Sequence, residues 1–117
     1  MDLPEDAGLL RIYVGENDRH GGRPLYEAIV LKAREMQIAG ATVMRGGMGY
    51  GHSSHLHSAK ILRLSDDLPL VIEIVDSPDK IDAFLPVLDG MMNDSMGSGL
   101  VTLENVQVLQ YGRQPAE

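Results

Sequence analysis

The sequence contains no cysteine and no tryptophan, and its only aromatic residues are four tyrosines and one phenylalanine, Phe84. Without cysteine the chain can form neither a disulfide framework nor a thiolate metal site. With so few aromatic residues, a core has to be built from Leu, Ile, Val, Ala and Met. The length of 117 residues is that of one domain. We therefore expect a single domain over 1–117, with a modest aliphatic core and an ordered part at about 9–111.

Positive charge is also scarce, since ten Lys and Arg residues stand against seventeen Asp and Glu, for a formal net charge of −7. Nucleic acids and anionic membrane surfaces are bound through cationic side chains, so neither partner is expected. No stretch approaches the ~20 apolar residues of a membrane span. The acidic start MDLPEDAG lacks the basic-then-apolar pattern of a signal peptide. A cytoplasmic protein without direct membrane insertion is expected.

The apolar residues that are present predict an alternation of strands and helices. Short apolar or β-branched segments predict strands at 9–15, from 41, from 59 to 76 and from 100. In the third of these, residues 59–64 begin the strand, SDDLP at 65–69 bends or interrupts it, and 68–76 is its strongest part. Apolar residues at helical spacing predict helices at about 24–40 and 77–92. The apolar alternation of the last strand changes phase near Glu104–Asn105, which predicts a bulge or a bend there.

Several residues mark the expected helix boundaries. Pro24 suits the first turn of the first helix, where its missing N–H costs nothing, and Gly40 is placed to end that helix. Ser77 is a good N-cap for the second helix, with Pro78 at its first position. Pro86 falls inside the second helical pattern and predicts a kink or a displacement.

The order β-α-β-β-α-β is that of the ferredoxin-like sandwich, an α+β fold in which two helices cover one face of an antiparallel sheet. In segment 68–76 alternate residues point to opposite faces. One face receives Leu70, Ile72 and Ile74, and the other receives Val71, Glu73 and Val75. Two helices can cover only one face. The second face therefore predicts a homo-oligomer, the alternative being a monomer with a half-solvated sheet.

The stretch GGMGYGHSSHLHSAK, residues 46–60, combines glycines with histidines. Its glycines either allow a ligand to approach the backbone or act as hinges; they are Gly46, Gly47, Gly49 and Gly51. Its histidines have side chains that bind divalent metals; they are His52, His55 and His57. A closed zinc site needs four ligands, so a fourth would come from Asp66, Asp67 or another subunit. The alternative is a solvated loop.

A second candidate is the segment ENDRHGGRP, residues 16–24, which precedes a helix. Arg19 and Arg23 offer forked donors beside the free N–H groups of a helix start, a combination suited to phosphate or carboxylate. In the alternative interpretation these arginines pair with Glu16 or Asp18, or with a neighbouring subunit. No serine, histidine and acid occur at a recognisable catalytic spacing, so an enzyme is not expected.

Together, four segments resemble the uncharacterised bacterial family of PII-like signalling proteins. These segments are GENDRHGGRPLYEAIVLKARE, GATVMRGGMGYG, ILRLSDDLPLVIEIVDSPDKI and GLVTLENVQV. The resemblance implies a homotrimer of ferredoxin-like subunits, with a ligand in clefts between subunits. It also implies that the loop at about 49–60 contacts a partner protein, such as a membrane transport protein.

The resemblance also places a phosphate-binding glycine loop at GSGL, with Gly97 and Gly99. Here Leu100 stands where PII proteins carry a lysine, and the closing strand has Gln107 and Gln110 but no arginine. These departures favour a small anionic ligand such as an adenine nucleotide of low phosphate number.

The loop at about 49–60 is expected to be a mobile partner-binding arm. Its contact residues are expected to be Tyr50, His52, His55, Leu56 and His57. The alternative function is that of a trimeric divalent-metal-binding protein, similar to the cation-tolerance relatives of this fold, which would use His52, His55 and His57.

Overall fold

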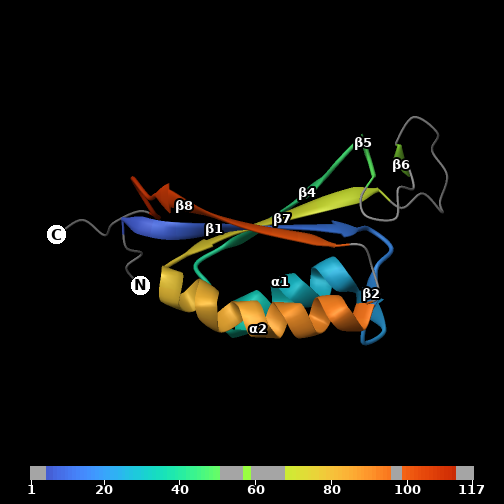
Figure 1. The fold of residues 1–117 in the computed structure, drawn as a ribbon, viewed down its shortest axis with the longest axis horizontal. Coiled ribbons are helices and arrows are strands. Elements are labelled where there is room, and N and C mark those ends of the chain that lie inside the picture. Colours follow the sequence, from blue (N-terminus) through green and yellow to red (C-terminus); the bar gives the residue numbers. More distant parts are fainter. Residues whose placement is uncertain (1–4, 51–56, 59–67, 96–98, 113–117) are drawn as a thin grey trace.

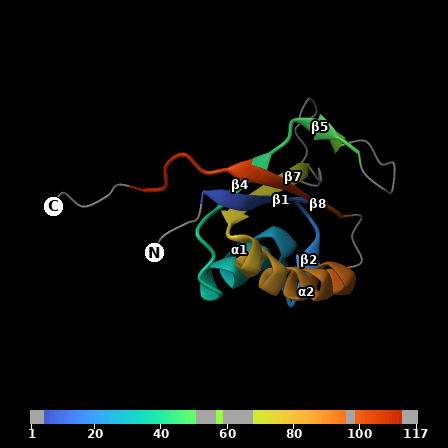
Figure 2. The same ribbon diagram turned by 60° about the vertical axis from the view of Figure 1, so that its left-hand side comes forward.

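The computed structural model describes residues 5–50, 57–58, 68–95 and 99–112. Four strands form the main sheet: β1 (Asp6–Gly15), β4 (Ala41–Arg45), β7 (Pro69–Asp76) and β8 (Leu100–Gln107). They lie in the order β4-β7-β1-β8, and each neighbouring pair is antiparallel. The helices α1 (Leu25–Glu35) and α2 (Pro78–Ser95) lie on the same face of this sheet (Figures 1 and 2). The predicted α+β class and the order β-α-β-β-α-β are confirmed.

Two short hairpins extend from the sheet. One consists of β2 (Arg19–His20) and β3 (Arg23–Pro24), between β1 and α1. The other consists of β5 (Met48–Gly49) and β6 (His57–Ser58), between β4 and β7. Neither helix in the described part of the chain is long and apolar enough to cross a membrane.

The core lies between the sheet and the helices and is aliphatic apart from Phe84, as the composition requires. Alternate residues of the two central strands point into it, namely Leu10, Ile12, Val14, Leu70, Ile72 and Ile74. The helices contribute Leu25, Ala28, Ile29, Ala33, Ile81, Phe84, Leu88 and Met91. Burying apolar surface in this way, at roughly 25 cal/mol per Å², is the main force that holds the helices to the sheet.

The end of α1 differs from the prediction that Gly40 stops the helix. The helix ends at Glu35, and Gln37 takes the left-handed conformation with φ 62°. The N–H of Gln37 donates to Arg34 O at 3.0 Å, and the N–H of Ile38 donates to Ala33 O at 3.0 Å. These are the two hydrogen bonds of a Schellman motif. The motif directs Ile38 against the core, and this contact offsets the strain of a left-handed glutamine.

The start of α2 agrees with the prediction. Ser77 precedes the helix, and its Oγ accepts a hydrogen bond from the N–H of Lys80 at 3.3 Å. Pro78 is the first helical residue, and the helix continues through Pro86 without interruption.

Three other expectations need correction. The first strand begins at Asp6 rather than residue 9, because Ala7 and Gly8 pair with β8 and are buried. Pro24 immediately precedes α1 with an extended ψ of 137°, because it belongs to the β2–β3 hairpin. The register between β1 and β8 is unbroken from Leu100 to Gln107, so the predicted bulge near Glu104–Asn105 is wrong. That change of phase reflects exposure at a sheet edge, where both faces of β8 are open.

Asp76, at the end of β7, ties the two helices together. Its side chain is buried, at 1% relative exposure. One carboxylate oxygen accepts a hydrogen bond from the N–H of Ala39 at 2.8 Å, and the other accepts one from the N–H of Ser77 at 2.6 Å. The same carboxylate therefore fixes the segment after α1 and the entry to α2.

Replacing Asp76 with alanine should lower the free energy of unfolding by roughly 2–4 kcal/mol, because two backbone N–H groups lose their acceptor in a buried place. Asp76→Asn keeps one acceptor oxygen, so its free energy of unfolding should fall less than that of Asp76→Ala. As a control, Asp79→Ala removes an exposed carboxylate from the first turn of α2 and should cost only about 0.3–1 kcal/mol. Urea unfolding followed by circular dichroism measures all three. A loss for Asp76→Ala no larger than that of the control would contradict this role.

Candidate functional site

The predicted ligand-binding residues that the structure describes gather at one end of the sheet. At this end β1 and β4 finish and β7 and β8 begin (Figure 1). Gly46 and Gly47 follow β4, and Gly99 immediately precedes β8. Arg19 and Arg23 lie on the β2–β3 hairpin, which follows β1. The structure thus brings two segments that were predicted separately to the same end of the sheet, namely the hairpin with Arg19 and Arg23 and the glycine segment that begins at Gly46.

The two glycine segments nevertheless lie at opposite edges of the sheet. Gly46 follows the edge strand β4, whereas Gly99 precedes the other edge strand, β8. Two central strands separate them, which at about 4.8 Å per strand spacing puts them roughly 14 Å apart. A single phosphate or carboxylate cannot contact both segments of one chain.

Packing explains two of the glycines after β4 and leaves a third unexplained. The N–H of Gly46 donates to Pro69 O at 2.7 Å, and a Cβ at Gly46 would lie 2.9 Å from Pro69 Cγ. A Cβ at Gly49 would lie 3.2 Å from the same atom. At Gly47 a Cβ would meet nothing within 4 Å. Gly46 and Gly49 therefore let the chain pass close to Pro69, and Gly47 is the one whose bare backbone is open to a ligand.

At Gly99 a Cβ would lie 3.3 Å from the backbone oxygen of Tyr13, a tight contact, and 2.1 Å from Met92 Cε, the end of a flexible side chain that would have to move. Beside Gly99 a cleft of about 760 Å³ runs between α2 and β8. Leu85 and Val101 give this cleft an apolar lining, and Asp82 and Asp89 give it acidic groups. Those carboxylates disfavour an anion inside the cleft itself, so an anion that contacts Gly99 would have to approach from the edge of β8 and not from between α2 and β8.

The β2–β3 hairpin presents the two predicted arginines. Gly21 and Gly22 have φ angles of 58° and 81°, as a two-residue turn with positive φ requires. Arg19 Nη2 donates to Gly22 O at 2.9 Å, so this guanidinium braces the turn. The side chain of Arg23 is exposed and forms no hydrogen bond or ion pair with another described residue.

The alternative partners of these arginines are engaged elsewhere. Glu16 forms an ion pair with Arg45, with 2.5 Å between Oε1 and Nη2. Asp18 accepts a hydrogen bond from the N–H of Gly15 at 2.9 Å. Arg23 is therefore available to bind an anion.

Arg45 is a cation at this end of the sheet that the sequence analysis missed. It is the last residue of β4, it directly precedes Gly46, and its side chain is 60% exposed. A basic residue immediately before a pair of glycines was the signal that could have identified it.

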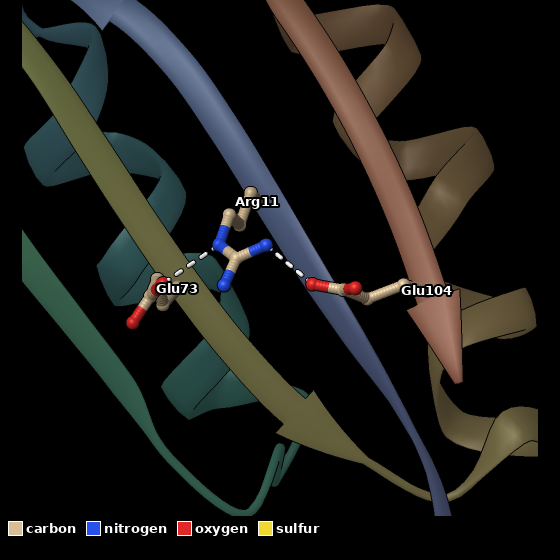
Figure 3. Close-up of polar contacts among 3 residues, drawn as sticks. All are labelled: Arg11, Glu73 and Glu104. Carbon is tan, nitrogen blue, oxygen red and sulfur yellow. Dashed lines mark hydrogen bonds and ion pairs between the residues drawn. The ribbon is translucent and has the colours of Figure 1, made fainter. Parts of the chain in front are cut away.

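The face of the sheet opposite the helices, which we name the open face, carries a charged cluster at its centre (Figure 3). Arg11, in the middle of β1, reaches toward both neighbouring strands. Its Nε donates to Glu73 Oε2 at 2.8 Å, and its Nη1 donates to Glu104 Oε1. The hydrogen bond to Glu73, with a smaller contribution from Glu104, raises the pKa of Arg11 above its ordinary value. Alternation in segment 68–76 placed Glu73 on this face but did not predict its partner.

Apolar side chains surround this cluster. Tyr13 and Val71 are paired across β1 and β7, and Met44 and Leu100 flank them on the edge strands. Tyr13, Met44 and Leu100 are exposed, at 37%, 43% and 57%. Toward the other end of this face lies a cleft of about 730 Å³, lined in part by Val75, Val106 and the segment 108–111. As expected, the second face has apolar residues that neither helix covers.

Several predicted residues lie outside the described residues. They are Gly51, His52, His55, Leu56 and Gly97, together with Asp66, Asp67 and the expected start of a strand at 59–64. Tyr50 follows β5 and is 71% exposed. The backbone of His57 pairs with Gly49, so the chain returns there beside its starting point. Among the described residues no three His, Cys, Asp or Glu side chains gather closely enough to hold a metal ion.

Two solved structures share this fold. A protein from Thermus thermophilus, described as PII-like signaling, superposes with a TM-score of 0.63 and 16% identity, covering 92% of this chain and 93% of that one. CPII from Thiomonas intermedia, bound to ADP and bicarbonate, superposes with a TM-score of 0.65 and 17% identity, covering 90% of each chain. At these identities the likeness concerns the fold.

Sequence comparison identifies closer relatives. A UPF0166 protein of Aquifex aeolicus is 39% identical over 101 residues, covering 86% of this chain and 91% of the relative. A UPF0166 protein of Methanocaldococcus jannaschii is 34% identical over 102 residues, covering 87% and 91%. Residues 7–108 match the model of the DUF190 family, described as "Uncharacterized ACR". The prediction of an uncharacterised family whose subunits share the fold of PII-like proteins is confirmed, and the chain belongs to the DUF190 family, which includes the UPF0166 proteins.

Proposed function

We propose that this protein is a cytoplasmic PII-like regulator that assembles as a homotrimer and binds a small anionic ligand between its subunits. An adenine nucleotide of low phosphate number, such as ADP, is the favoured ligand class. The observation that carries the proposal is the position of Gly46–Gly47 and Gly99 at opposite edges of one sheet. A site that uses both segments needs the β4 edge of one subunit and the β8 edge of the next.

The open face supports assembly. A sheet with helices on one side only leaves its other face to water or to another molecule, and this face carries exposed Tyr13, Met44 and Leu100. Both edge strands also have unpaired backbone groups in the described structure. Edges of this kind are templates for pairing with another chain.

The cations at the site favour a ligand with few phosphates. Arg19, Arg23 and Arg45 lie at the relevant end of the sheet, but Arg19 braces its own turn and Arg45 is paired with Glu16. Leu100 opens β8 where the resemblance led us to expect a lysine. Arg23 is therefore the free arginine of the three, and Arg45, although paired with Glu16, is still largely exposed. With so few cations available, ADP or AMP suits the site better than a triphosphate. CPII, which shares the fold, was solved with ADP and bicarbonate.

The segment at about 49–60 would carry the signal to a partner. It begins at the β5–β6 hairpin, which adjoins the glycine segment, so a ligand at Gly47 lies close to its base. The ligand can shift the conformation of this segment only if the ligand binds more tightly to the protein in one conformation of the segment than in another. The regulated partner would be another protein, such as a membrane transport protein, and the role is regulatory rather than catalytic.

A charge placed on the open face should break the assembly. Light scattering should give wild-type protein a mass near three times the chain mass of 12.8 kDa. Val71→Asp should give a mass near one chain, because an unpaired charge buried in an apolar contact is costly. As a control, Leu31→Asp introduces the same charge at an exposed position on α1 and should leave the mass unchanged. A wild-type monomer at micromolar concentration, or a Val71→Asp trimer, would contradict the proposed interface.

Removing the free arginine should weaken ADP binding without unfolding the protein. Arg23→Ala should raise the dissociation constant about 10- to 100-fold, the loss expected for a hydrogen bond to a charged group. Arg23→Lys keeps the positive charge but loses the two parallel donors of the guanidinium, so its dissociation constant for ADP should lie between those of the wild type and Arg23→Ala. Arg34→Ala, an exposed arginine near the end of α1, is the charge-matched control. Isothermal titration with ADP measures each constant, and equal binding by Arg23→Ala would place the site elsewhere.

A further inference from the structure

The charged cluster of the open face lies within a polar row that crosses all four strands. Glu73 and Arg11 are direct neighbours in this row, with Thr42 and Thr102 on the edge strands, and Glu104 lies diagonally beside it. Two residues further along each strand is the apolar row Met44, Val71, Tyr13 and Leu100. On the other side of the polar row Leu9 pairs with Val75. The open face is therefore a polar stripe between apolar stripes.

The hydrogen-bonding capacity of the cluster is incomplete within one chain. The ion pairs use Nε and Nη1 of Arg11 and one oxygen of each glutamate. Within the described part of the chain, Nη2 of Arg11 and the other two oxygens form no further hydrogen bond. The side chains are 36%, 31% and 53% exposed for Arg11, Glu73 and Glu104, so water can satisfy these groups in a lone subunit. A molecule that covers the open face removes this water and has to supply donors and acceptors of its own.

A second copy of this chain supplies both. The cluster holds one cation and two anions, so a neighbouring copy can offer a carboxylate to the free donor of Arg11 and a guanidinium to the free carboxylate oxygens. The exposed surface of α2, in contrast, carries Asp79 and the two cleft residues Asp82 and Asp89, and it would repel its counterpart in a chain of net charge −7. The open face thus combines opposite charges with exposed apolar side chains, and a second copy of the chain can match both.

We propose that Arg11, Glu73 and Glu104 determine the register in which copies of this chain meet, by pairing across the interface with the same cluster of a neighbouring copy. This inference rests on the assembly proposed above. A slip of two residues, about 6.8 Å along the strands, would place the charges of one copy against the apolar row of the next. Buried charges without partners exclude such registers, whereas apolar contacts alone tolerate them.

Removing only the cation of the cluster should weaken assembly. Replacing all three charged residues should restore assembly, but into complexes of mixed size. Arg11→Met leaves two carboxylates unpaired and should raise the concentration of half-dissociation at least about 100-fold. The triple variant Arg11→Met, Glu73→Met and Glu104→Met should assemble again, but as a mixture of sizes, because no charge distinguishes one register from another. Arg11→Lys keeps the charge without the fork and should assemble more weakly than wild type.

Analytical ultracentrifugation and native mass spectrometry measure both quantities, and circular dichroism confirms that each variant is folded. The matched control is Lys32→Met, which removes the surface ion pair with Glu35 on α1 and should leave a single trimeric species. The inference would be overturned if Arg11→Met dissociated at the same concentration as the wild type. It would also be overturned if the triple variant formed a single trimeric species, as the wild type is expected to do. A monomeric wild type would overturn it together with the proposed assembly. A wild-type trimer that fails to bind ADP would refute the ligand proposal alone and leave this inference intact.

Discussion

The structure depends on one constraint, which is that both helices pack on the same face of a four-stranded sheet. The core forms entirely on that side, from the inward residues of β1 and β7 and the apolar stripes of α1 and α2. Asp76 reinforces the layer by holding the segment after α1 to the start of α2. The other face keeps apolar residues around a central ion-pair cluster. In the proposed function, this uncovered face brings subunits together.

The same constraint explains why the candidate site is divided. In the order β4-β7-β1-β8 the two outer strands are the ones that adjoin the glycine segments. In the proposed function one subunit would present half of the site at each edge, and a symmetric ring of subunits would bring the unlike halves together. Each chain would then contribute to two sites. Ligand binding and assembly would in that case be linked, because a ligand that bridges two subunits stabilises their contact.

The sequence predicted the features that depend on local pattern. Strict alternation in 68–76 identified β7 and its two faces, and the signals at Ser77 and Pro78 placed the start of α2. The end of α1 was predicted incorrectly, because the contact of Ile38 with the core outweighs the preference for glycine and favours Gln37. The bulge near Glu104–Asn105 was wrong because edge exposure, rather than a register change, disturbs the alternation of β8.

The site was less predictable, because it depends on pairing between distant segments. Arg11 is 62 residues from Glu73 and 93 from Glu104, and a slip of one residue in register would have put them on opposite faces. Likewise the sequence could not separate Gly46, which packs on Pro69, from Gly47, which has open space. The availability of Arg23 became clear only once Glu16 and Asp18 were found with other partners.

The absence of native cysteine allows a direct test of whether the open face is covered in solution. Thr102 is exposed in the subunit and lies beside Arg11 on the open face, whereas Ala83 is exposed on the outer side of α2. The measurement is the rate at which a maleimide labels Thr102→Cys and Ala83→Cys, each relative to the same variant unfolded, since a thiol reacts only where reagent reaches it. Coverage by other subunits predicts that Thr102→Cys reacts much more slowly than Ala83→Cys. Equal rates at the two positions would show that the open face is free and would contradict the account.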